Sequence, residues 1–411
     1  MRILIATDYY PPFVGGAQIQ SRLLARNLRA RGHDVCVVTV TQPGLPVTET
    51  DGDIPVYRLR HLRTVFESRR QGTQSHHPPF VDPVTSLALR RLIRDFDPDV
   101  VHSFGWISYS CAAALTGRRT PLVVAARDYG YFCANRTLLR DGRACSGPST
   151  AKCLACAGRN YGRPKGWIAA ATVLASRPYL RRRIAALHCI STYVFDTLRR
   201  DFLGRSPRMP TYVIHDAVDA AEPDVSEEAR ARLRQLPNEP FILFVGAMRE
   251  AKGVAELLAA YERLRNPPPL VLLGTIEPDA PKFFPPGVHV VPAVPHTTVL
   301  AAWDRSLFGV MPSLLPEPLG TVVAEAMTRG KAVIGTAPGG HTDMILPGET
   351  GLLVPRGDVE ALAWAMQQLL DDPDLRERLG REAAARSRRF ASSVSITEVE
   401  RMLAEAIERS R

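Results

Sequence analysis

Short apolar segments alternate with helical patterns in this sequence, and the alternation restricts the chain to folds built on parallel sheets. Residues 2–6 are mostly apolar, residues 18–31 carry isoleucine and leucine at helical spacing, and residues 34–40 are mostly apolar again. Two strands joined through a helix run in the same direction, because the helix returns the chain to the starting edge of the sheet. This segment therefore predicts one strand–helix–strand unit.

The same unit recurs and predicts two domains. Further strand-like segments lie at residues 99–102, 121–125, 241–245, 270–273 and 332–334. The pattern begins afresh after residue 210, and 411 residues exceed what one hydrophobic core usually organises. We expect an α/β fold with two doubly wound, Rossmann-like domains that face a cleft. The first domain spans residues 1–208 and the second spans residues 209–390. A helix over 391–411 then crosses back to the first domain.

Basic residues are concentrated in the first half of the chain. Residues 1–208 contain 31 Lys and Arg against 14 Asp and Glu, a net charge of +17, whereas the remainder has a net charge of −7. This asymmetry indicates an anionic partner, such as a phosphate-bearing lipid, an anionic membrane surface or a nucleic acid, although an arginine-rich solvated surface gives the same count. No apolar run reaches the ~20 residues that span a bilayer, and no signal-cleavage pattern is present, so we expect a cytoplasmic protein.

Residues 316–327 combine a loop carboxylate with the start of a helix. Glu317 lies in the loop after a strand-like segment, Gly320 opens the helix, and Glu325 follows within it. The amino end of a helix presents free N–H groups and a positive dipole, which suit a diphosphate. A loop carboxylate can bind sugar hydroxyls and a helical one can bind both ribose hydroxyls. A capped helix with one surface glutamate fits the same residues.

The spacing of Glu317 and Glu325 resembles the E-x7-E motif of the retaining GT-B glycosyltransferases of family GT4. Residues 330–334, 338–340 and 347–354 are similar to the segments that follow this motif in the family. Gly15 and Gly16 lie in a segment similar to the family's Gly-Gly loop, and residues 245–253 are similar to the segment that grips the donor diphosphate. The resemblance covers nearly the whole chain. It implies a GT-B fold and sugar transfer from a nucleotide-sugar donor with retention of configuration.

The resemblance also implies roles for individual residues. Gly15 and Gly16 would let the backbone close against the donor phosphates. Lys252 would neutralise charge that grows on the leaving diphosphate. Glu317 would orient the transferred sugar, and Glu325 would hold the ribose. The other donor-binding candidates are Gly246, Arg249, Leu319, Gly320 and Thr321. Family members of this kind need no metal or other cofactor for catalysis.

Two positions depart from the family pattern. Ala247 stands where many relatives carry arginine, and nearby Arg249 could substitute for it. Arg127-Asp128 stands where relatives often have His-Asp. A guanidinium stays protonated and cannot imitate a neutral imidazole, so we expect Arg127 to bind an anionic acceptor or the diphosphate. Asp128 remains a candidate contact of the sugar or the acceptor.

Four of the seven cysteines lie within residues 133–156. They are Cys133, Cys145, Cys153 and Cys156, and they end in a Cys-x-x-Cys pair. Four thiolates that converge tetrahedrally make a structural zinc site, whereas a cytoplasmic address disfavours disulfides. We expect a structural zinc here; free thiols, an iron–sulfur cluster and a redox pair also fit the spacing.

Residues 165–184 mix aromatic and aliphatic side chains with Arg181, Arg182 and Arg183. Together with Trp167 and Leu180, these arginines predict either an interfacial helix on anionic lipid or an ordinary helix beside the acceptor. A peripheral position on the inner face of the membrane follows from the first interpretation.

From these features we expect a UDP- or GDP-sugar as the donor. The expected acceptor is a glycan, a lipid-linked molecule or a small molecule, and the basic charge suggests that it is anionic or lipid-linked. Acceptors of this kind occur in polysaccharide biosynthesis. A GT-B epimerase or phosphorylase would share the fold, but we identify neither an acid/base carboxylate set nor a lysine for pyridoxal phosphate. A non-catalytic protein that binds nucleic acid would interleave aromatic and basic residues, whereas aromatics make up only 7% of the chain. Nucleic acid is therefore not favoured as a partner.

Overall fold

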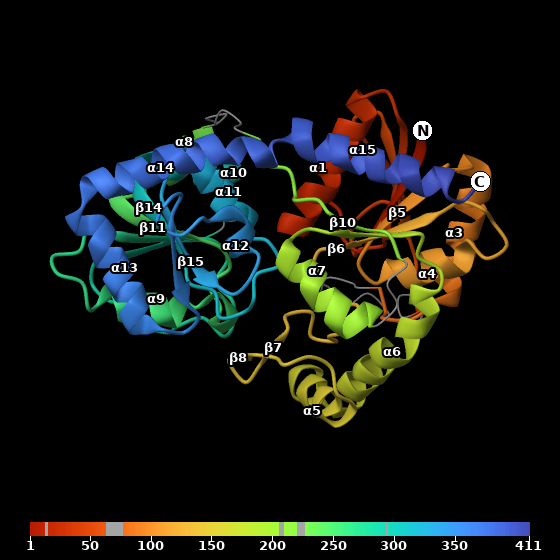
Figure 1. Cartoon of the computed structure of the whole chain (residues 1–411), viewed down its shortest axis with the longest axis horizontal. Helices are drawn as coiled ribbons and strands as arrows, with labels where there is room; N and C mark the ends of the chain where they lie inside the picture. Colours follow the sequence, from red (N-terminus) through yellow and green to blue (C-terminus); the bar gives the residue numbers. More distant parts are fainter. Residues whose placement is uncertain (13–14, 63–76, 205–208, 220–226, 293–294) are drawn as a thin grey trace. The chain divides into compact units, whose positions relative to one another are not determined.

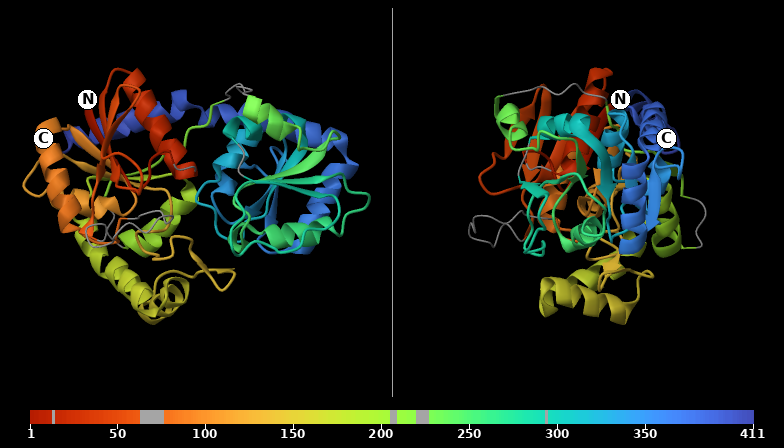
Figure 2. Two further views of the ribbon diagram at one scale, coloured as in Figure 1. Left: turned by 180° about the vertical axis from the view of Figure 1, so that it is seen from behind. Right: turned by 90° about the vertical axis from the view of Figure 1, so that its left-hand side faces the viewer.

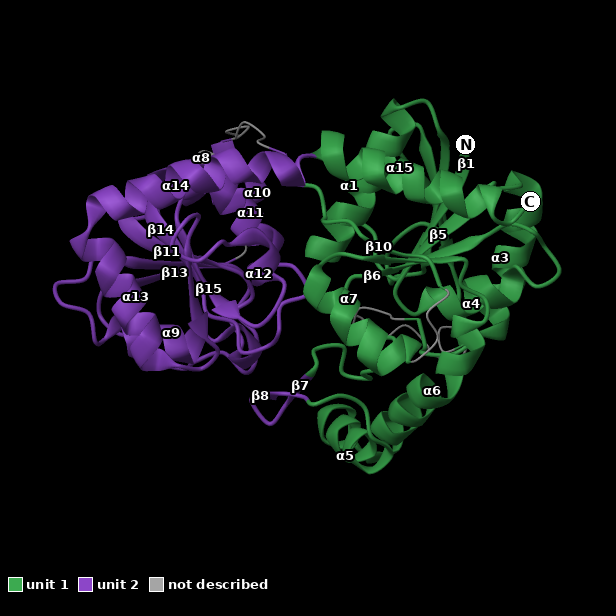
Figure 3. Cartoon of the chain, viewed as in Figure 1, with its two compact units in different colours: residues 1–138, 146–217, 392–411 green, residues 139–145, 218–391 purple. Residues whose placement is uncertain are grey.

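The computed structural model describes residues 1–12, 15–62, 77–204, 209–219, 227–292 and 295–411 (Figure 1). These residues form two compact units, each with its own sheet (Figure 3). The first unit comprises Met1–Leu138, Ser146–Ala217 and Ser392–Arg411, and the second comprises Leu139–Cys145 and Val218–Ala391.

An eight-stranded sheet forms the first unit, in the order β10-β9-β6-β5-β1-β2-β4-β3. Only β3 runs antiparallel to its neighbour, β4. The order reverses between β1 and β5, and ligands of doubly wound folds bind at the carboxyl ends of the strands where such a reversal occurs. The strands are β1 (Arg2–Thr7), β2 (Asp34–Val40), β3 (Thr48–Asp51), β4 (Ile54–Leu59), β5 (Val100–Phe104), β6 (Leu122–Ala126), β9 (Ala186–Cys189) and β10 (Thr211–Val213).

Helices cover this sheet and bury its apolar residues. They include α1 (Gly16–Ala30), α3 (Pro83–Phe96), α4 (Ile107–Ala114), α7 (Thr192–Leu198) with the π-helical turn η1 (Arg199–Leu203), and α15 (Ser392–Glu408). Asp82 is the N-cap residue of α3, and its carboxylate accepts a hydrogen bond of 2.8 Å from the Thr85 N–H group. Helix α15 buries Ile396, Val399 and Met402 in the same core as β1.

Two further helices, α5 (Thr150–Tyr161) and α6 (Arg163–Arg181), form a helical hairpin joined at Gly162. They lie side by side at the margin of the first unit in both views of Figure 2. A Cβ on Gly166 would lie 2.0 Å from the Ala157 carbonyl oxygen, so glycine lets the two backbones approach closely. The short strands β7 (Leu139–Arg140) and β8 (Arg143–Ala144) pair in antiparallel fashion just before this hairpin.

A six-stranded parallel sheet forms the second unit, in the order β13-β12-β11-β14-β15-β16. Its strand order reverses between β11 and β14. The strands are β11 (Phe241–Val245), β12 (Leu270–Leu273), β13 (Val288–Val291), β14 (Ser306–Met311), β15 (Val333–Ala337) and β16 (Leu352–Pro355). The helices are α8 (Glu227–Leu233), η2 (Glu250–Lys252), α9 (Val254–Tyr261), α10 (His296–Arg305), α11 (Thr321–Thr328), α12 (His341–Met344), α13 (Val359–Asp371), α14 (Pro373–Ser387) and η3 (Arg388–Phe390).

The units differ from the expected division in two places. Leu139–Cys145, expected in the first domain, groups with the second unit. Residues 211–213 were assigned to the second domain by the boundary at 208, but they form β10, which pairs in parallel with β9 of the first sheet. A strand of three residues has too little apolar pattern to be recognised before its partner is known. Among the residues that the structure describes, no helix is both long enough and apolar enough to cross a bilayer.

Candidate active site

The loops after β11 and β14 meet at the carboxyl edge of the second sheet, where its strand order reverses. Gly246 follows β11 and precedes η2, which ends at Lys252. Pro312 and Ser313 follow β14. The N–H groups of Leu314 and Leu315 both donate to the Ala251 carbonyl, at 3.1 and 3.2 Å, and hold the two loops together. This position suits a ligand site.

Lys252 and Glu317 form an ion pair at this edge. The Lys252 Nζ atom lies 2.7 Å from Glu317 Oε1, and the Ser313 hydroxyl also donates to that oxygen. Burial by itself raises the pKa of the Glu317 carboxyl, but Lys252, His341 and Ser313 together hold this pKa below its ordinary value. Glu317 is therefore an ionised, buried hydrogen-bond acceptor.

Two glycines make the close approach of these loops possible. Gly253 adopts φ 70°, and a Cβ there would lie 2.0 Å from the Pro312 carbonyl oxygen. A Cβ on Gly340 would lie 2.4 Å from the Pro318 carbonyl oxygen, and the Gly340 N–H group donates to the Glu317 carbonyl at 2.7 Å. A larger residue at either position would push Lys252 and Glu317 apart.

The amino end of α11 adds an electropositive group to the same edge. Gly320 is the N-cap residue in the left-handed conformation, and no described side chain caps the first turn, which Thr321 opens. Leu319 is buried beneath it. Arg249 precedes Lys252, and its buried Nε atom has no hydrogen-bond partner in the part of the chain that is described. An unsatisfied cationic donor on the loop after β11 and a free helix amino end on the loop after β14 both fit an anion such as a diphosphate.

Glu325 lies further along α11 and is paired with a histidine from another helix. The His296 Nε2 atom, at the start of α10, lies 3.0 Å from Glu325 Oε1. This hydrogen bond raises the pKa of the His296 imidazole. The Glu325 carboxylate is mostly buried whereas His296 is half exposed, so the imidazole covers the carboxylate from the solvent side.

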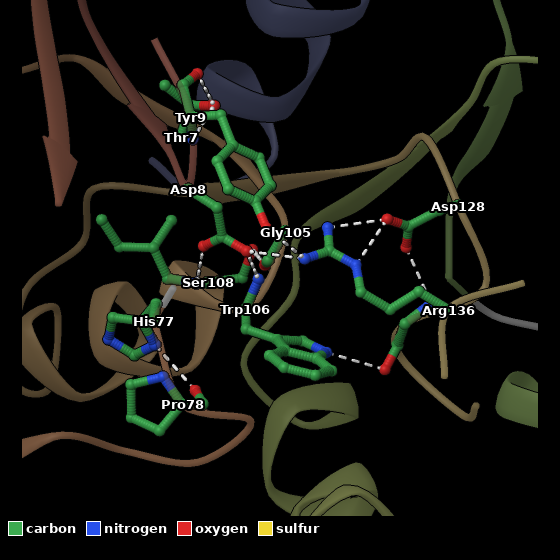
Figure 4. A network of polar contacts seen from close by, with 12 residues as sticks. Thr7, Asp8, Tyr9, His77, Pro78, Gly105, Trp106, Ser108, Asp128 and Arg136 are labelled. Carbon is green, nitrogen blue, oxygen red and sulfur yellow. Dashed lines mark hydrogen bonds and ion pairs between the residues drawn. The ribbon is translucent and has the colours of Figure 1, made fainter. Parts of the chain in front are cut away.

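A buried polar network occupies the carboxyl edge of the first sheet, between β1 and β5 (Figure 4). Asp8 directly follows β1, and its carboxylate accepts hydrogen bonds of 2.8 Å from the N–H groups of Trp106 and Ile107. Burial raises the pKa of Asp8, although Arg136 and these N–H groups oppose the shift. Asp8 thus acts as a carboxylate cap for α4.

Arg136 connects Asp8 to Asp128. Its Nε and Nη2 atoms both lie 2.7 Å from Asp128 Oδ2, and its Nη1 atom lies 3.5 Å from Asp8 Oδ2. The guanidinium also lies over the rings of Tyr9 and Trp106, 5.5 and 5.1 Å from their centroids. Arg136 adopts φ 63°, a strained backbone conformation that these contacts stabilise. Asp128, which follows β6, is consequently held in one orientation.

Arg127 has a different environment from Asp128. Its Nη2 and Nη1 atoms lie 2.9 and 3.2 Å from the two Asp216 oxygens, and its guanidinium lies 4.8 Å from the Phe104 ring centroid. Burial lowers the pKa of Arg127 and raises that of Asp216, each opposed by the charge of the other. Because Asp216 already neutralises Arg127, the binding of an anion by Arg127 stays a prediction.

Gly15 is the N-cap residue of α1. A Cβ on Gly15 would approach only the end of the flexible Gln18 side chain, at 2.4 Å, and its φ of 173° is open to any residue. The protein itself does not demand glycine there, so the predicted role of Gly15 and Gly16 depends on the donor phosphates.

The four clustered cysteines form no disulfide and are partly buried. Cys153 and Cys156 lie on α5, where the Ser149 N–H group donates to Cys153 Sγ at 3.4 Å and Asn135 donates to Cys156 Sγ at 3.3 Å. In the described part of the chain, no three His, Cys, Asp or Glu side chains lie close enough to share a metal ion. Zinc at Cys133, Cys145, Cys153 and Cys156 therefore stays a prediction.

Several residues of these sites were not identified from the sequence. Ser313, His341 and His296 contact or influence the two glutamates, and Arg136 orients Asp128. Arg136 lies in the cysteine-rich segment, where the sequence pattern points only to the thiols. His296 lies 29 residues before Glu325, and no local spacing signals their contact.

Comparisons with known proteins agree with this geometry. Residues 15–215 match the profile of the glycosyl transferase 4-like domain, and residues 225–386 match that of glycosyl transferases group 1. Glycogen synthase of Mycobacterium tuberculosis is 28% identical over 94% of this chain and 90% of its own length.

Solved structures show the same fold. Sucrose-phosphate synthase of Thermosynechococcus elongatus superposes with a TM-score of 0.77 and 21% identity over the full length of both chains. Anabaena HepE, solved in complex with UDP-glucose, superposes with a TM-score of 0.70 and 16% identity over 98% of this chain and all of its own.

The two parallel-sheet units define the GT-B class of protein. Within that class, the chain is a GT-B glycosyltransferase of the hexosyltransferase kind, which uses a nucleotide-sugar donor. The epimerase, phosphorylase and nucleic-acid-binding alternatives are not favoured by any of these relatives.

Proposed function

We propose that the chain transfers a sugar from a UDP- or GDP-sugar to a glycan, lipid-linked or small-molecule acceptor with retention of anomeric configuration. The observation that supports this most is the Lys252–Glu317 pair beside the uncapped amino end of α11. It combines a cation and helix N–H groups for a diphosphate with a buried carboxylate for sugar hydroxyls.

In this proposal the second unit binds the donor. Lys252, Arg249 and the amino end of α11 bind the diphosphate, and the buried Nε atom of Arg249 gains a partner there. Negative charge grows on the diphosphate as its bond to the anomeric carbon breaks, and these preoriented groups stabilise that charge without a metal ion. Glu317 accepts hydrogen bonds from the sugar. Glu325 accepts hydrogen bonds from the ribose once the ribose has displaced the His296 imidazole.

The acceptor in this proposal lies at the carboxyl edge of the first sheet, where Asp128 is held by Arg136. Asp128 would accept a hydrogen bond from an acceptor hydroxyl. The basic charge of residues 1–208 favours an acceptor that carries phosphate or is linked to a lipid. A cytoplasmic enzyme at the inner face of a membrane, engaged in polysaccharide biosynthesis, would meet such an acceptor. A structural zinc at the four cysteines belongs to the same proposal.

A donor screen without acceptor tests the donor chemistry. Purified protein is incubated with UDP-, GDP- and ADP-sugars, and slow release of the nucleotide identifies the donor. We expect release to continue in the presence of a chelator and to fall about 10²-fold or more in Lys252→Ala, because a transition-state cation has been removed. Lys282→Ala, which changes an exposed lysine of the same unit, should leave the rate unchanged.

The stereochemistry of transfer is measured by NMR once a donor is known. Retention requires that the first anomer formed keep the configuration of the donor sugar. Release of the opposite anomer would overturn the retaining mechanism, and the absence of release or binding with every donor would overturn the donor assignment.

A further inference from the structure

The α5–α6 hairpin is strongly basic and contains no carboxylate. Between Asp141 and Asp196 the sequence has nine Lys and Arg and not a single Asp or Glu. Six of these cations lie on the two helices: Lys152 and Arg159 on α5, and Arg163, Lys165, Arg177 and Arg181 on α6. A helical surface without any opposing charge is unusual for a solvated face, where both signs normally alternate. The hairpin therefore carries a uniform positive field.

Helix α6 exposes an apolar stripe along one face. Pro164, Ile168, Ala171, Ala175 and Pro178 are all exposed, and they follow one another at helical spacings of four, three, four and three residues. Such spacing places side chains on one side of a helix. The face opposite is the packed one, since Gly166, Ala170, Val173 and Leu180 are buried. The stripe thus faces away from the core of its own unit.

Large apolar side chains border the stripe near the turn of the hairpin. Ile168 is 60% exposed, Trp167 is 49% exposed and Tyr161 is 41% exposed. Tyr161 donates to the Ala134 carbonyl at 3.0 Å, so its ring is held in place while it faces solvent. Tryptophan and tyrosine favour the boundary between water and hydrocarbon, because one end of each ring is apolar and the other polar.

The two ends of α6 supply cations to flank the stripe. Arg163 and Lys165 are exposed at its start, and Arg182 is exposed just after its end. A groove of about 290 Å³ at this second end is lined by Pro178, Arg181, Arg182, Leu203 and Met209. Two guanidinium groups on an apolar groove are suited to a phosphate that is attached to a hydrocarbon chain.

The residues available for a membrane contact differ in part from those that the sequence pattern suggested for an interfacial helix. Leu180 is fully buried, and Arg183 donates to Thr116 at 3.0 Å and lies over the Tyr179 ring. Leu180 therefore cannot reach a membrane, and the Arg183 guanidinium is already engaged by Thr116 and Tyr179. The contact surface shifts from the end of α6 to its exposed face and the turn that precedes it.

The geometry points to the exposed face of α6 as a docking surface for an anionic lipid bilayer. The helix lies in the plane of the interface, with Ile168 and Trp167 among the acyl chains and the flanking cations at the headgroups. At 19 residues, α6 would cover about 28 Å of that plane. A second copy of the chain is a poor occupant, because it would bring two carboxylate-free basic faces together. This surface and the donor site share no residue, so the test of the surface needs no turnover.

Vesicle flotation of the full-length protein tests the proposal. Vesicles of phosphatidylcholine with phosphatidylglycerol should carry the protein at low salt and release it at high salt, whereas pure phosphatidylcholine should bind it weakly. The double variant Arg163→Gln/Lys165→Gln should lower the partition coefficient about 25-fold, at about fivefold per cation. Ile168→Ser should lower it about tenfold, because apolar burial is lost.

Matched variants of the second unit serve as controls. Trp364→Ser removes an exposed tryptophan of α13, and Arg381→Gln removes an exposed arginine of α14; both should bind vesicles as the parent does. Trp167→Phe should keep binding but lose the blue shift of tryptophan fluorescence that accompanies it. Donor hydrolysis should be the same in all these variants, which separates this proposal from the proposed function.

Three outcomes would overturn the docking surface. One is failure of the parent protein to float with anionic vesicles at low salt. Another is flotation with anionic vesicles that is the same in Ile168→Ser and in the double variant Arg163→Gln/Lys165→Gln as in the parent protein. The third is concentration-dependent self-association that Ile168→Ser abolishes, in the absence of vesicle binding, which would assign the stripe to a dimer.

Discussion

His296 Nε2 lies 3.0 Å from Glu325 Oε1, so the carboxylate assigned to the ribose is already engaged by an imidazole. The histidine begins α10 and the glutamate lies on α11. A donor that binds Glu325 must displace or share this imidazole. The pair therefore links donor affinity to the protonation of one residue.

Glu325→Ala should weaken donor binding. Loss of hydrogen bonds to a ribose costs about 1–3 kcal/mol, which is roughly a 5- to 150-fold rise in Kd. Isothermal titration with the donor measures the change, and Glu360→Ala, an exposed glutamate of the same unit, is the control. Donor affinity equal to that of the parent would remove Glu325 from the site.

Glu317→Gln should lower kcat more than it raises donor KM. The amide keeps the shape of the side chain but loses the charge that Lys252 and Ser313 stabilise, so the sugar would be oriented less firmly. Steady-state kinetics at saturating donor separates the two parameters. A rise in KM with kcat unchanged would assign Glu317 to ground-state binding alone.

Donor affinity should rise with pH through the titration of His296. Its pKa is raised by Glu325, so the protonated form stabilises the folded protein below an ordinary imidazole pKa of about 6.5, and this contribution is lost as pH rises through the raised pKa. Neutral His296 releases Glu325 to the ribose. We expect His296→Gln to flatten the dependence of donor Kd on pH, whereas His289→Gln, at an exposed position of β13, should keep it. An unchanged profile in His296→Gln would contradict the link.

Arg127→Gln should destabilise the fold. It leaves Asp216 buried without its partner, and breaking one side of a buried pair costs about 3–5 kcal/mol. Urea unfolding measures the loss, and Arg118→Gln, from a more exposed pair with Asp97, should cost less than about 1 kcal/mol. A variant as stable as the parent but with weakened donor or acceptor binding would instead support the anion-binding role of Arg127.

Gently purified protein should contain close to one zinc per chain. A chelator should lower its melting temperature without stopping donor hydrolysis, because the metal is structural. Elemental analysis and thermal unfolding provide both measurements. If neither zinc nor iron is found, the thiols are free, and Cys153→Ser/Cys156→Ser should then be nearly harmless.

The parallel sheets could be predicted because their strands are apolar on both faces. The segments at 2–6, 34–40 and 241–245 are mostly apolar, and each forms a strand. Strand β10 could not be assigned, since its three residues are only half-buried and take their place from β9.

The two glutamates of the candidate site could be found because one motif contains both. The ion pairs could not be predicted: Lys252, itself a candidate residue, lies 65 residues from its partner Glu317, and in the first unit Arg136 lies 128 residues from Asp8. These contacts arise where the strand order of each sheet reverses, so they depend on topology. The exposed stripe on α6 also required the structure, because the sequence pattern alone did not distinguish its packed face from its solvent face.

Helix α15 has a consequence for the biosynthesis of the chain. Its residues Ile396, Val399 and Met402 complete the core around β1, and Glu400 pairs with Arg31 and His33. The ribosome makes β1 before the second unit and α15 only after the whole of that unit. Part of the apolar surface of the first sheet therefore stays exposed until α15 has been synthesised. The second unit by then has all its strands and can fold on its own. The half of the protein that is synthesised first is the half that finishes folding last.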